Sequence, residues 1–153
     1  MHFMEKVIRS IAELERFAQE YLKALPAHAH KATVVGLSGD LGSGKTAFAK
    51  ATARALGISE AVLSPTFVIA KFYKIPEHPR WSHFVHIDAY RIEDSAELKP
   101  LKWHDITADP RNIVLIEWPE RIGELFPPDA AMLRFRFINE TTRVIISKIW
   151  LHG

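Results

Sequence analysis

Eight consecutive residues in the first third of the chain have types and spacing that could do chemistry. They read Gly39-Asp40-Leu41-Gly42-Ser43-Gly44-Lys45-Thr46 and fit G-x-x-x-x-G-K-[ST], the pattern of a phosphate-binding loop, or P-loop. The glycines allow successive backbone N–H groups to face one anion. Lys45 can reach the β- and γ-phosphate oxygens, and the Thr46 hydroxyl can ligate Mg²⁺. The motif therefore predicts a nucleotide phosphate site, and an unrelated glycine-rich turn is the alternative.

The segments on either side of the motif favour the P-loop interpretation. Residues 32–38 read ATVVGLS, which suits a strand buried on both faces of a parallel sheet. Residues 46–56 read TAFAKATARAL and predict an alanine-rich helix, which Gly57 would end. A P-loop requires this order of strand, loop and helix, and the helix dipole would add to phosphate binding.

A P-loop works with acidic residues, because Mg²⁺ prefers oxygen ligands and the attacking water must be oriented. Residues 112–116 predict a second buried strand, and Glu117 follows it directly. P-loop proteins usually place an acid at this point, so Glu117 is a candidate Mg²⁺ ligand. The alternative is an ordinary carboxylate at the end of a strand.

Asp88 is the second acidic candidate, since it follows an apolar strand predicted over residues 81–87. It could orient water, act as a base or support the metal, and a structural acid is an equal alternative. His86 shares its strand face and could pair with Asp88 on a metal or form a hydrogen bond behind the Mg²⁺ site. Thr66, within Ser64-Pro65-Thr66-Phe67, could sense the γ-phosphate as switch loops do, or simply form a turn.

The remaining elements must hold these side chains in place. A capping box at Ser10 and Glu13 predicts a helix that Pro26 stops. Hairpins are predicted from residues 67–75 with 81–87 and from 132–138 with 143–150, and short helices over 95–101 and 119–126. We therefore expect an α/β P-loop NTPase three-layer fold, with a mixed, mostly parallel central sheet and antiparallel hairpin additions, forming a single ATPase domain over residues 1–153.

Composition narrows the classes of protein further. The chain has 153 residues, a formal net charge of +2 and no cysteine, which excludes a disulfide scaffold and a thiolate nucleophile. No window predicts a membrane span or a signal peptide, so a cytoplasmic location is expected. His28 and His30 fall in a linker, which a solvated loop explains better than a metal site.

The kind of nucleotide and two rival functions can be weighed from the same residues. The chain lacks the guanine-reading N-K-x-D motif, which favours ATP. A small-molecule kinase is one rival, but no cluster of lid arginines stands between Arg91 and Glu117. A nucleotide-gated module that binds tRNA or protein is the other, with a basic face formed by Arg134, Arg136, Arg143 and Lys148.

Four segments, in this order and spacing, resemble the TsaE (formerly YjeE) family. They are GDLGSGKT (39–46), SPTF (64–67), HIDAYR (86–91) and IEWPE (116–120). Family members look like compact P-loop ATPases required for threonylcarbamoyladenosine modification of tRNA beside the anticodon. The resemblance covers nearly the whole chain. Two stretches depart from the family pattern, at Arg16 and over residues 97–103.

The resemblance implies a set of roles for individual residues. Residues 40–46 would hold the phosphates of ATP, and Thr46 and Glu117 would serve Mg²⁺. Trp118 would lie near the nucleotide. The residues implied in hydrolysis are Lys45, Asp88, Glu117 and Thr66.

The resemblance also implies partners. These are TsaD and TsaB, with TsaC supplying the threonylcarbamoyl-adenylate, and ATP turnover would reset the TsaB–TsaD complex. Any contact with tRNA would be indirect, through that complex. The loop itself contains no arginine finger, and Arg91 is the best candidate elsewhere in the chain, so we expect slow turnover alone and stimulation by a partner.

Overall fold

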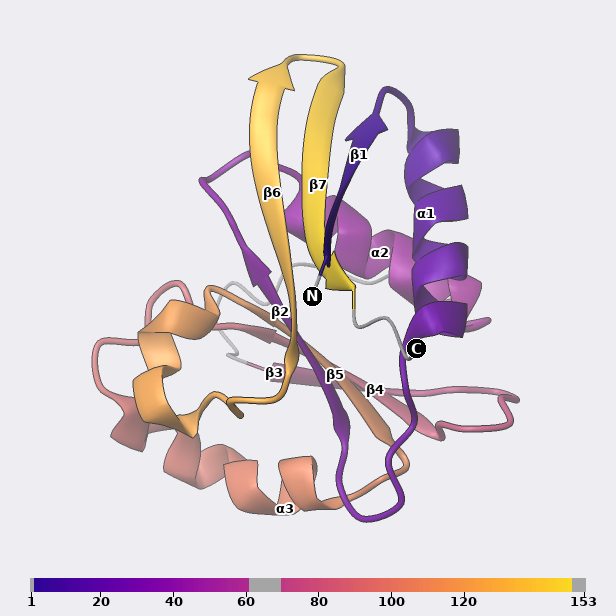
Figure 1. The fold of residues 1–153 in the computed structure, drawn as a ribbon. Helices are drawn as coiled ribbons and strands as arrows, with labels where there is room; N and C mark the ends of the chain where they lie inside the picture. Colours follow the sequence, from indigo (N-terminus) through magenta and orange to yellow (C-terminus); the bar gives the residue numbers. More distant parts are fainter. Residues whose placement is uncertain (1, 61–69, 150–153) are drawn as a thin grey trace.

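The computed structural model describes residues 2–60 and 70–149 (Figure 1). In these residues seven strands form one sheet in the order β1-β7-β6-β2-β5-β4-β3. The strands are β1 (His2–Ile8), β2 (Thr33–Ser38), β3 (Ala70–Lys74), β4 (His83–Asp88), β5 (Asn112–Glu117), β6 (Ala131–Asn139) and β7 (Thr142–Ile149). Every residue of β5 is buried, as is β2 up to Leu37, which confirms the two strands predicted as buried.

The centre of the sheet is parallel and its edges are antiparallel. Parallel pairs join β4 to β5, β5 to β2 and β2 to β6. Antiparallel pairs add β3 to β4, β7 to β6 and β1 to β7. This arrangement confirms the predicted mixed sheet and both predicted hairpins. The strand β1 was not predicted, because of its described side chains only Ile8 is buried and the pattern lacks an apolar face.

Two helices cover one face of the sheet (Figure 1). The helix α1 (Ile11–Ala24) starts at Ser10, whose hydroxyl accepts a hydrogen bond from the Glu13 amide at 3.1 Å. The Glu13 carboxylate in turn accepts from the Arg9 amide at 2.6 Å, one residue earlier than a capping box predicts. The helix α2 (Lys45–Ala55) is followed, as predicted, by Gly57 just beyond its C-terminal end, and the φ of 82° at this residue suits glycine.

The opposite face is covered by short helices. They are the 3₁₀ helices η1 (Ser95–Leu101) and η2 (Pro119–Leu125) and the helix α3 (Trp103–Ala108) between them in the chain. The predicted helices over 95–101 and 119–126 are therefore confirmed as 3₁₀ turns, and α3 was not predicted. It begins after Lys102, whose left-handed backbone, with a φ of 55°, changes the direction of the chain between η1 and α3.

Along the central strands, successive side chains point to opposite faces of the sheet and so belong to two separate hydrophobic cores. Val35, Leu37 and Leu115 pack with α1 and α2, where Phe17 and Phe48 lie 5.9 Å apart between ring centroids. Val34, Val114 and Ile116 pack with η1, α3 and η2 on the other side. The result is the predicted three-layer arrangement, in which the parallel strands β2, β4 and β5 end at one edge.

Candidate functional site

The P-loop leaves the end of β2 and enters the first turn of α2. Gly39, Gly42 and Gly44 have φ angles of 144°, 77° and 109°, a region that favours glycine. A Cβ at Gly39 would lie 2.4 Å from the Phe135 carbonyl oxygen and 2.8 Å from Ser43 Oγ. The first glycine of the motif is therefore required both for its backbone angle and for its contact with β6.

Lys45 is held within the loop by backbone oxygens. Its ammonium donates to the carbonyls of Gly39 and Asp40, the latter at 2.8 Å, and to Ser43 Oγ at 3.3 Å. It also lies 4.4 Å from the centroid of the Trp118 ring. Burial lowers the pKa of Lys45, while the carboxylates of Glu117 and Asp88 act in the opposite direction. The charge of Lys45 is thus surrounded by oxygens of the loop's own residues.

Thr46 and Glu117 are brought together although 71 residues separate them in the chain. The Thr46 hydroxyl donates to Glu117 Oε1 at 2.9 Å. The second carboxylate oxygen, Oε2, lies 2.7 Å from His86 Nε2. Glu117 is 2% exposed and His86 is fully buried. The Glu117 carboxylate is therefore fixed beside the last residue of the P-loop.

Asp88 occupies the same level on the neighbouring strand, directly opposite Glu117 in the β4–β5 register. Its Oδ1 accepts from the Tyr90 amide at 3.0 Å. Burial raises the pKa of Asp88, the Tyr90 amide opposes this shift, and repulsion from Glu117 adds to it. Two carboxylates in different environments thus stand side by side at the ends of β4 and β5.

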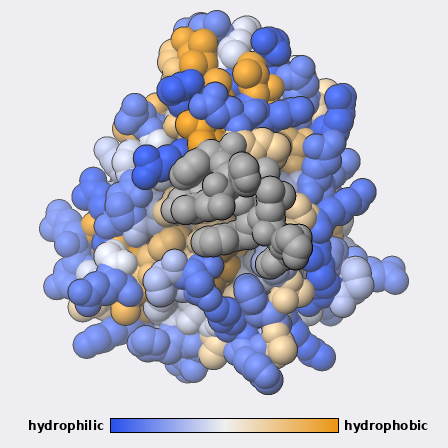
Figure 2. Space-filling model, viewed as in Figure 1, coloured by the Kyte–Doolittle hydropathy of each residue, from blue (hydrophilic) through white to orange (hydrophobic). Residues whose placement is uncertain are grey.

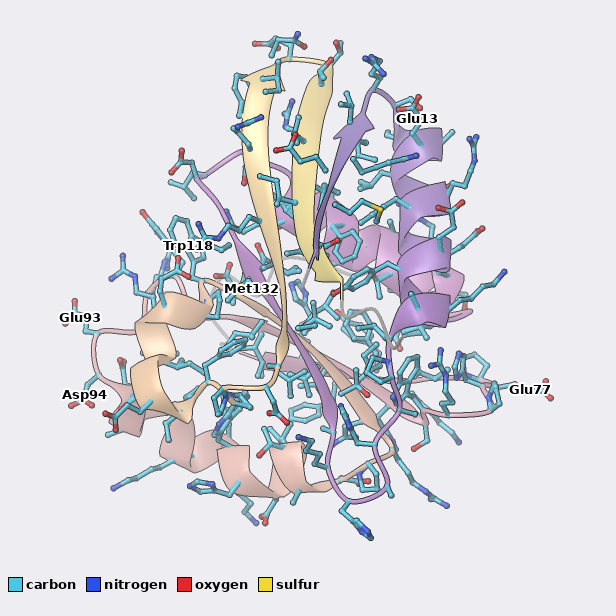
Figure 3. The ribbon with its side chains drawn as sticks, viewed as in Figure 1. Glu13, Glu77, Glu93, Asp94, Trp118 and Met132 are labelled. Atoms are coloured by element: carbon cyan, nitrogen blue, oxygen red, sulfur yellow. The ribbon has the colours of Figure 1, made fainter. Side chains whose placement is uncertain are left out.

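Backbone hydrogen bonds tie together the three strands that carry these groups. The Ala89 amide donates to the Glu117 carbonyl at 3.0 Å, and the Trp118 amide donates to the Leu37 carbonyl at 3.1 Å. Trp118 itself has a φ of 61°, a left-handed conformation that is uncommon for so large a residue. In this conformation its ring reaches both Lys45 and Tyr90, the latter at 5.1 Å between ring centroids. Figure 3 labels Trp118 where the chain leaves β5.

A cavity of about 290 Å³ adjoins the other side of the P-loop. Ser43, Gly44 and Ala47 line it from the loop and α2, and Ile8, Phe135 and Arg143 line it from the strands β1, β6 and β7. Arg143 Nε is buried and has no hydrogen-bond partner among the described residues. Sequence analysis missed this cavity, because it depends on the pairing of β1 with β7, for which no local pattern exists.

The donors near Thr46 suit Mg²⁺ better than a softer metal. The Thr46 hydroxyl and the Glu117 carboxylate are hard oxygen ligands, and Mg²⁺ usually takes only one or two protein oxygens besides phosphate and water. Among the described residues no group of three or more histidine, cysteine, aspartate or glutamate side chains could hold a metal ion. His86, for which the sequence left open a metal pair with Asp88, has its Nε2 against Glu117 Oε2.

Two other predictions from sequence concern the switch-like Thr66 and the basic face of the C-terminal hairpin. Thr66 and the rest of segment 64–67 lie outside the described residues. The basic face was partly wrong: Arg134 and Arg136 are exposed on β6, but Arg143 pairs with Phe137 and therefore shares the opposite face, beside the P-loop. In the described part of the chain no helix is long and apolar enough to cross a membrane.

Exposed apolar side chains lie beside the site, at Leu41 and Tyr90, and also farther from it. Figure 2 shows hydrophobic residues at the end of the β6–β7 hairpin, where Phe137 and Ile138 are about half exposed.

The strand–loop–helix unit, with an acid at the end of the neighbouring strand, defines the P-loop class of nucleotide-binding folds.

Comparison with known proteins places the chain within that class. The family model of TsaE, described as "Threonylcarbamoyl adenosine biosynthesis protein TsaE", matches residues 8–145. The chain therefore belongs to the TsaE family.

Individual relatives agree with this assignment. The tRNA threonylcarbamoyladenosine biosynthesis protein TsaE of Bacillus subtilis is 36% identical over 80% of this chain and 73% of its own length. That of Synechocystis is 32% identical over 80% of this chain and 74% of its own length. The crystal structure of Bacillus subtilis YdiB superposes with a TM-score of 0.68 and 26% identity, covering 95% of this chain and 84% of YdiB.

Proposed function

We propose that this chain, as a single cytoplasmic ATPase domain over residues 1–153, hydrolyses ATP with Mg²⁺ and acts with TsaB and TsaD homologues in threonylcarbamoyladenosine modification of tRNA. The observation that carries the proposal is the convergence of Lys45, Thr46 and Glu117 at the P-loop. Lys45 lies within the loop, and the Thr46 hydroxyl contacts Glu117 at 2.9 Å. Family membership supports the biological role.

The chain's own residues account for phosphate binding. The loop amides and the N-terminal end of α2 offer positive charge to the phosphates, and Lys45 exchanges its carbonyl partners for β- and γ-phosphate oxygens. Thr46 and Glu117 would hold Mg²⁺, which supplies charge neutralisation between these phosphates. These groups stabilise the charge that develops as the bond to the γ-phosphoryl group breaks.

Asp88 would orient the water that attacks the γ-phosphorus. It lies opposite Glu117 in the sheet register, and its Oδ1 is fixed by the Tyr90 amide. The raised pKa of Asp88, caused first by burial, makes it a better proton acceptor than an ordinary surface aspartate. Glu117 is less suited to this role, since its two oxygens already contact Thr46 and His86.

The nucleoside would occupy the cavity beside Ser43 and Gly44. Its volume of about 290 Å³ lies at the lower end of the range for small-ligand sites, and Ile8, Leu14 and Phe135 give it apolar walls. Arg143 lines the cavity and supplies a cation there, and its Nη1 donates to the carbonyls of Asn139 and Thr142. The cavity and the loop together would hold a whole nucleotide.

An ATPase assay tests the enzymatic part. We expect slow turnover by the wild type and a marked increase on adding TsaB and TsaD homologues, since a missing arginine finger typically costs ~10³–10⁵ in rate. Lys45→Ala should lower turnover by about 10²–10³-fold. Lys50→Ala is the matched control, because it removes the same charge from an exposed position on the same helix. Equal turnover with and without the partners would contradict the proposed dependence on them.

A reconstituted modification assay tests the biological part. TsaB and TsaD homologues would be incubated with unmodified tRNA, ATP and the threonylcarbamoyl-adenylate that TsaC supplies, and threonylcarbamoyladenosine measured by mass spectrometry. We expect repeated rounds of modification only when this chain is added, and none of this gain with Lys45→Ala. A full yield without the chain would refute its role.

A further inference from the structure

Within the HIDAYR segment, the side chain of His86 is fully buried and contacts Glu117 at the candidate site. It stands on β4 diagonally across from Glu117 on β5, because Asp88 is directly opposite Glu117 and His86 precedes Asp88 by two residues. Residues two apart on a strand point to the same face of the sheet, so His86 and Glu117 share one face. The imidazole spans this gap to Glu117 Oε2 at 2.7 Å.

The imidazole completes the fixation of the Glu117 carboxylate. One oxygen, Oε1, accepts from Thr46 at 2.9 Å, and the other faces His86. Glu117 is 2% exposed, so water cannot readily replace either partner. Without His86, the carboxylate could rotate about its last side-chain torsion and turn Oε1 away from Thr46.

The other ring nitrogen indicates which atom carries the proton. His86 Nδ1 is buried and has no hydrogen-bond partner among the described residues. A buried N–H without an acceptor is unfavourable, whereas an N–H at Nε2 has Glu117 as its acceptor. The ring otherwise packs against Phe84, with 6.3 Å between centroids. Its orientation is thus explained by one polar contact, the one to Glu117.

We propose that His86 is a positioning residue, which donates from Nε2 to Glu117 Oε2 and so keeps Oε1 turned toward Thr46 and the divalent cation that accompanies the nucleotide. This inference rests on the proposed function. A positioning role can be distinguished by measurement from a purely structural one, because it affects binding of the cation and not the phosphate loop.

The test measures binding of a fluorescent ADP analogue across a Mg²⁺ titration and in EDTA. His86→Phe keeps an aromatic ring, though a larger one, but removes the donor, and His86→Gln restores an N–H donor at a similar reach. For His86→Phe we expect the Mg²⁺ midpoint to rise about 10–100-fold, with affinity in EDTA unchanged, since supporting partners of a ligand have effects of this size. His86→Gln should recover most of the loss.

Val85→Ala is the control for packing. Val85 is fully buried on the same strand but belongs to the core of the other face. It should lower thermal stability and leave the Mg²⁺ midpoint unchanged. A wild-type midpoint in His86→Phe, or an equal loss of nucleotide affinity in EDTA, would overturn the inference. A wild type that binds no nucleotide at all would instead refute the proposed function, and the inference with it.

A spectroscopic measurement keeps the inference testable even where a variant fails to fold. In a long-range ¹H–¹⁵N spectrum of wild-type protein, we expect the His86 ring, assigned by the signal missing from His86→Gln or by through-bond transfer, to carry its proton on Nε2. A proton on Nδ1 alone would overturn the inference, because Nε2 could not then donate to Glu117.

Discussion

The two halves of the sheet differ in what they contribute to the site. The parallel strands β2, β5 and β4 end together; Glu117 and Asp88 stand at the ends of β5 and β4, and Lys45 begins α2 after the loop that follows β2. The antiparallel strands β6, β7 and β1 carry no such cluster among the described residues, but they wall the cavity beside Gly44 with Arg143 and apolar side chains. Under the function proposed above, the first half would perform the chemistry and the second would hold the nucleoside.

The strongest test of this division changes the parallel half. Asp88→Asn keeps the shape of the side chain but removes the base, so turnover should fall about 10²–10⁴-fold. Nucleotide affinity should stay near that of the wild type, because the loop and the cavity are untouched. Single-turnover ATP hydrolysis and equilibrium binding measure the two quantities separately. If turnover and nucleotide affinity fell by the same factor, Asp88 would serve binding rather than chemistry.

A smaller effect is expected from the antiparallel half. Arg143→Leu removes the cation from the cavity, and a hydrogen bond to a charged group is worth about 1.5–3 kcal/mol, which corresponds to roughly 10–100-fold in affinity. Turnover at saturating ATP should change little. Arg136→Leu is the matched control, since this arginine is exposed on the opposite face of the same hairpin. Equal losses in the two variants would argue against a nucleoside in the cavity.

The smallest expected effect concerns stability. Because burial raises the pKa of Asp88 in the folded protein, its contribution to stability is complete below the ordinary aspartate range and is lost as the pH rises through the raised pKa. Asp88→Asn cannot ionise and avoids this loss. Its melting temperature should exceed that of the wild type at pH 7–8 by about 2–4 °C per kcal/mol gained, and the difference should vanish near pH 4.

Asp129 provides a control of opposite sign for this measurement. The hydrogen bond from Lys31 lowers the pKa of Asp129, so its contribution is present at neutral pH and lost as the pH falls. Asp129→Asn should therefore slightly lower the melting temperature at pH 7. A rise in both variants would show that charge removal alone, and not burial of Asp88, controls the result.

The same two halves differ in how well the sequence predicts them. The P-loop, its strand and the end of α2 at Gly57 follow from local patterns of glycine and apolar residues. The strand β1 and the cavity do not, because they arise from a pairing with β7 far along the chain. The basic face failed for a related reason: the hairpin register decides which residues share a face, and it pairs Arg143 with Phe137 and Arg136 with Val144.

Within the candidate site, sequence could predict where the two acids stand but not their surroundings. Glu117 and Asp88 were predicted from their positions after apolar strands. That His86 faces Glu117, and that Trp118 turns its ring over Lys45 through a left-handed backbone, depends on geometry between strands and on one unusual φ angle.

Two backbone hydrogen bonds at the ends of the β4–β5 and β5–β2 ladders offer natural reporters of the site. The amide protons of Ala89 and Trp118 are each held by the carbonyl of a neighbouring strand, next to the acidic residues. In hydrogen-exchange terms, they can exchange with solvent only when those strand ends separate. Their exchange rates would therefore record how often the two carboxylates drift apart, and a partner that closes the site would slow them together.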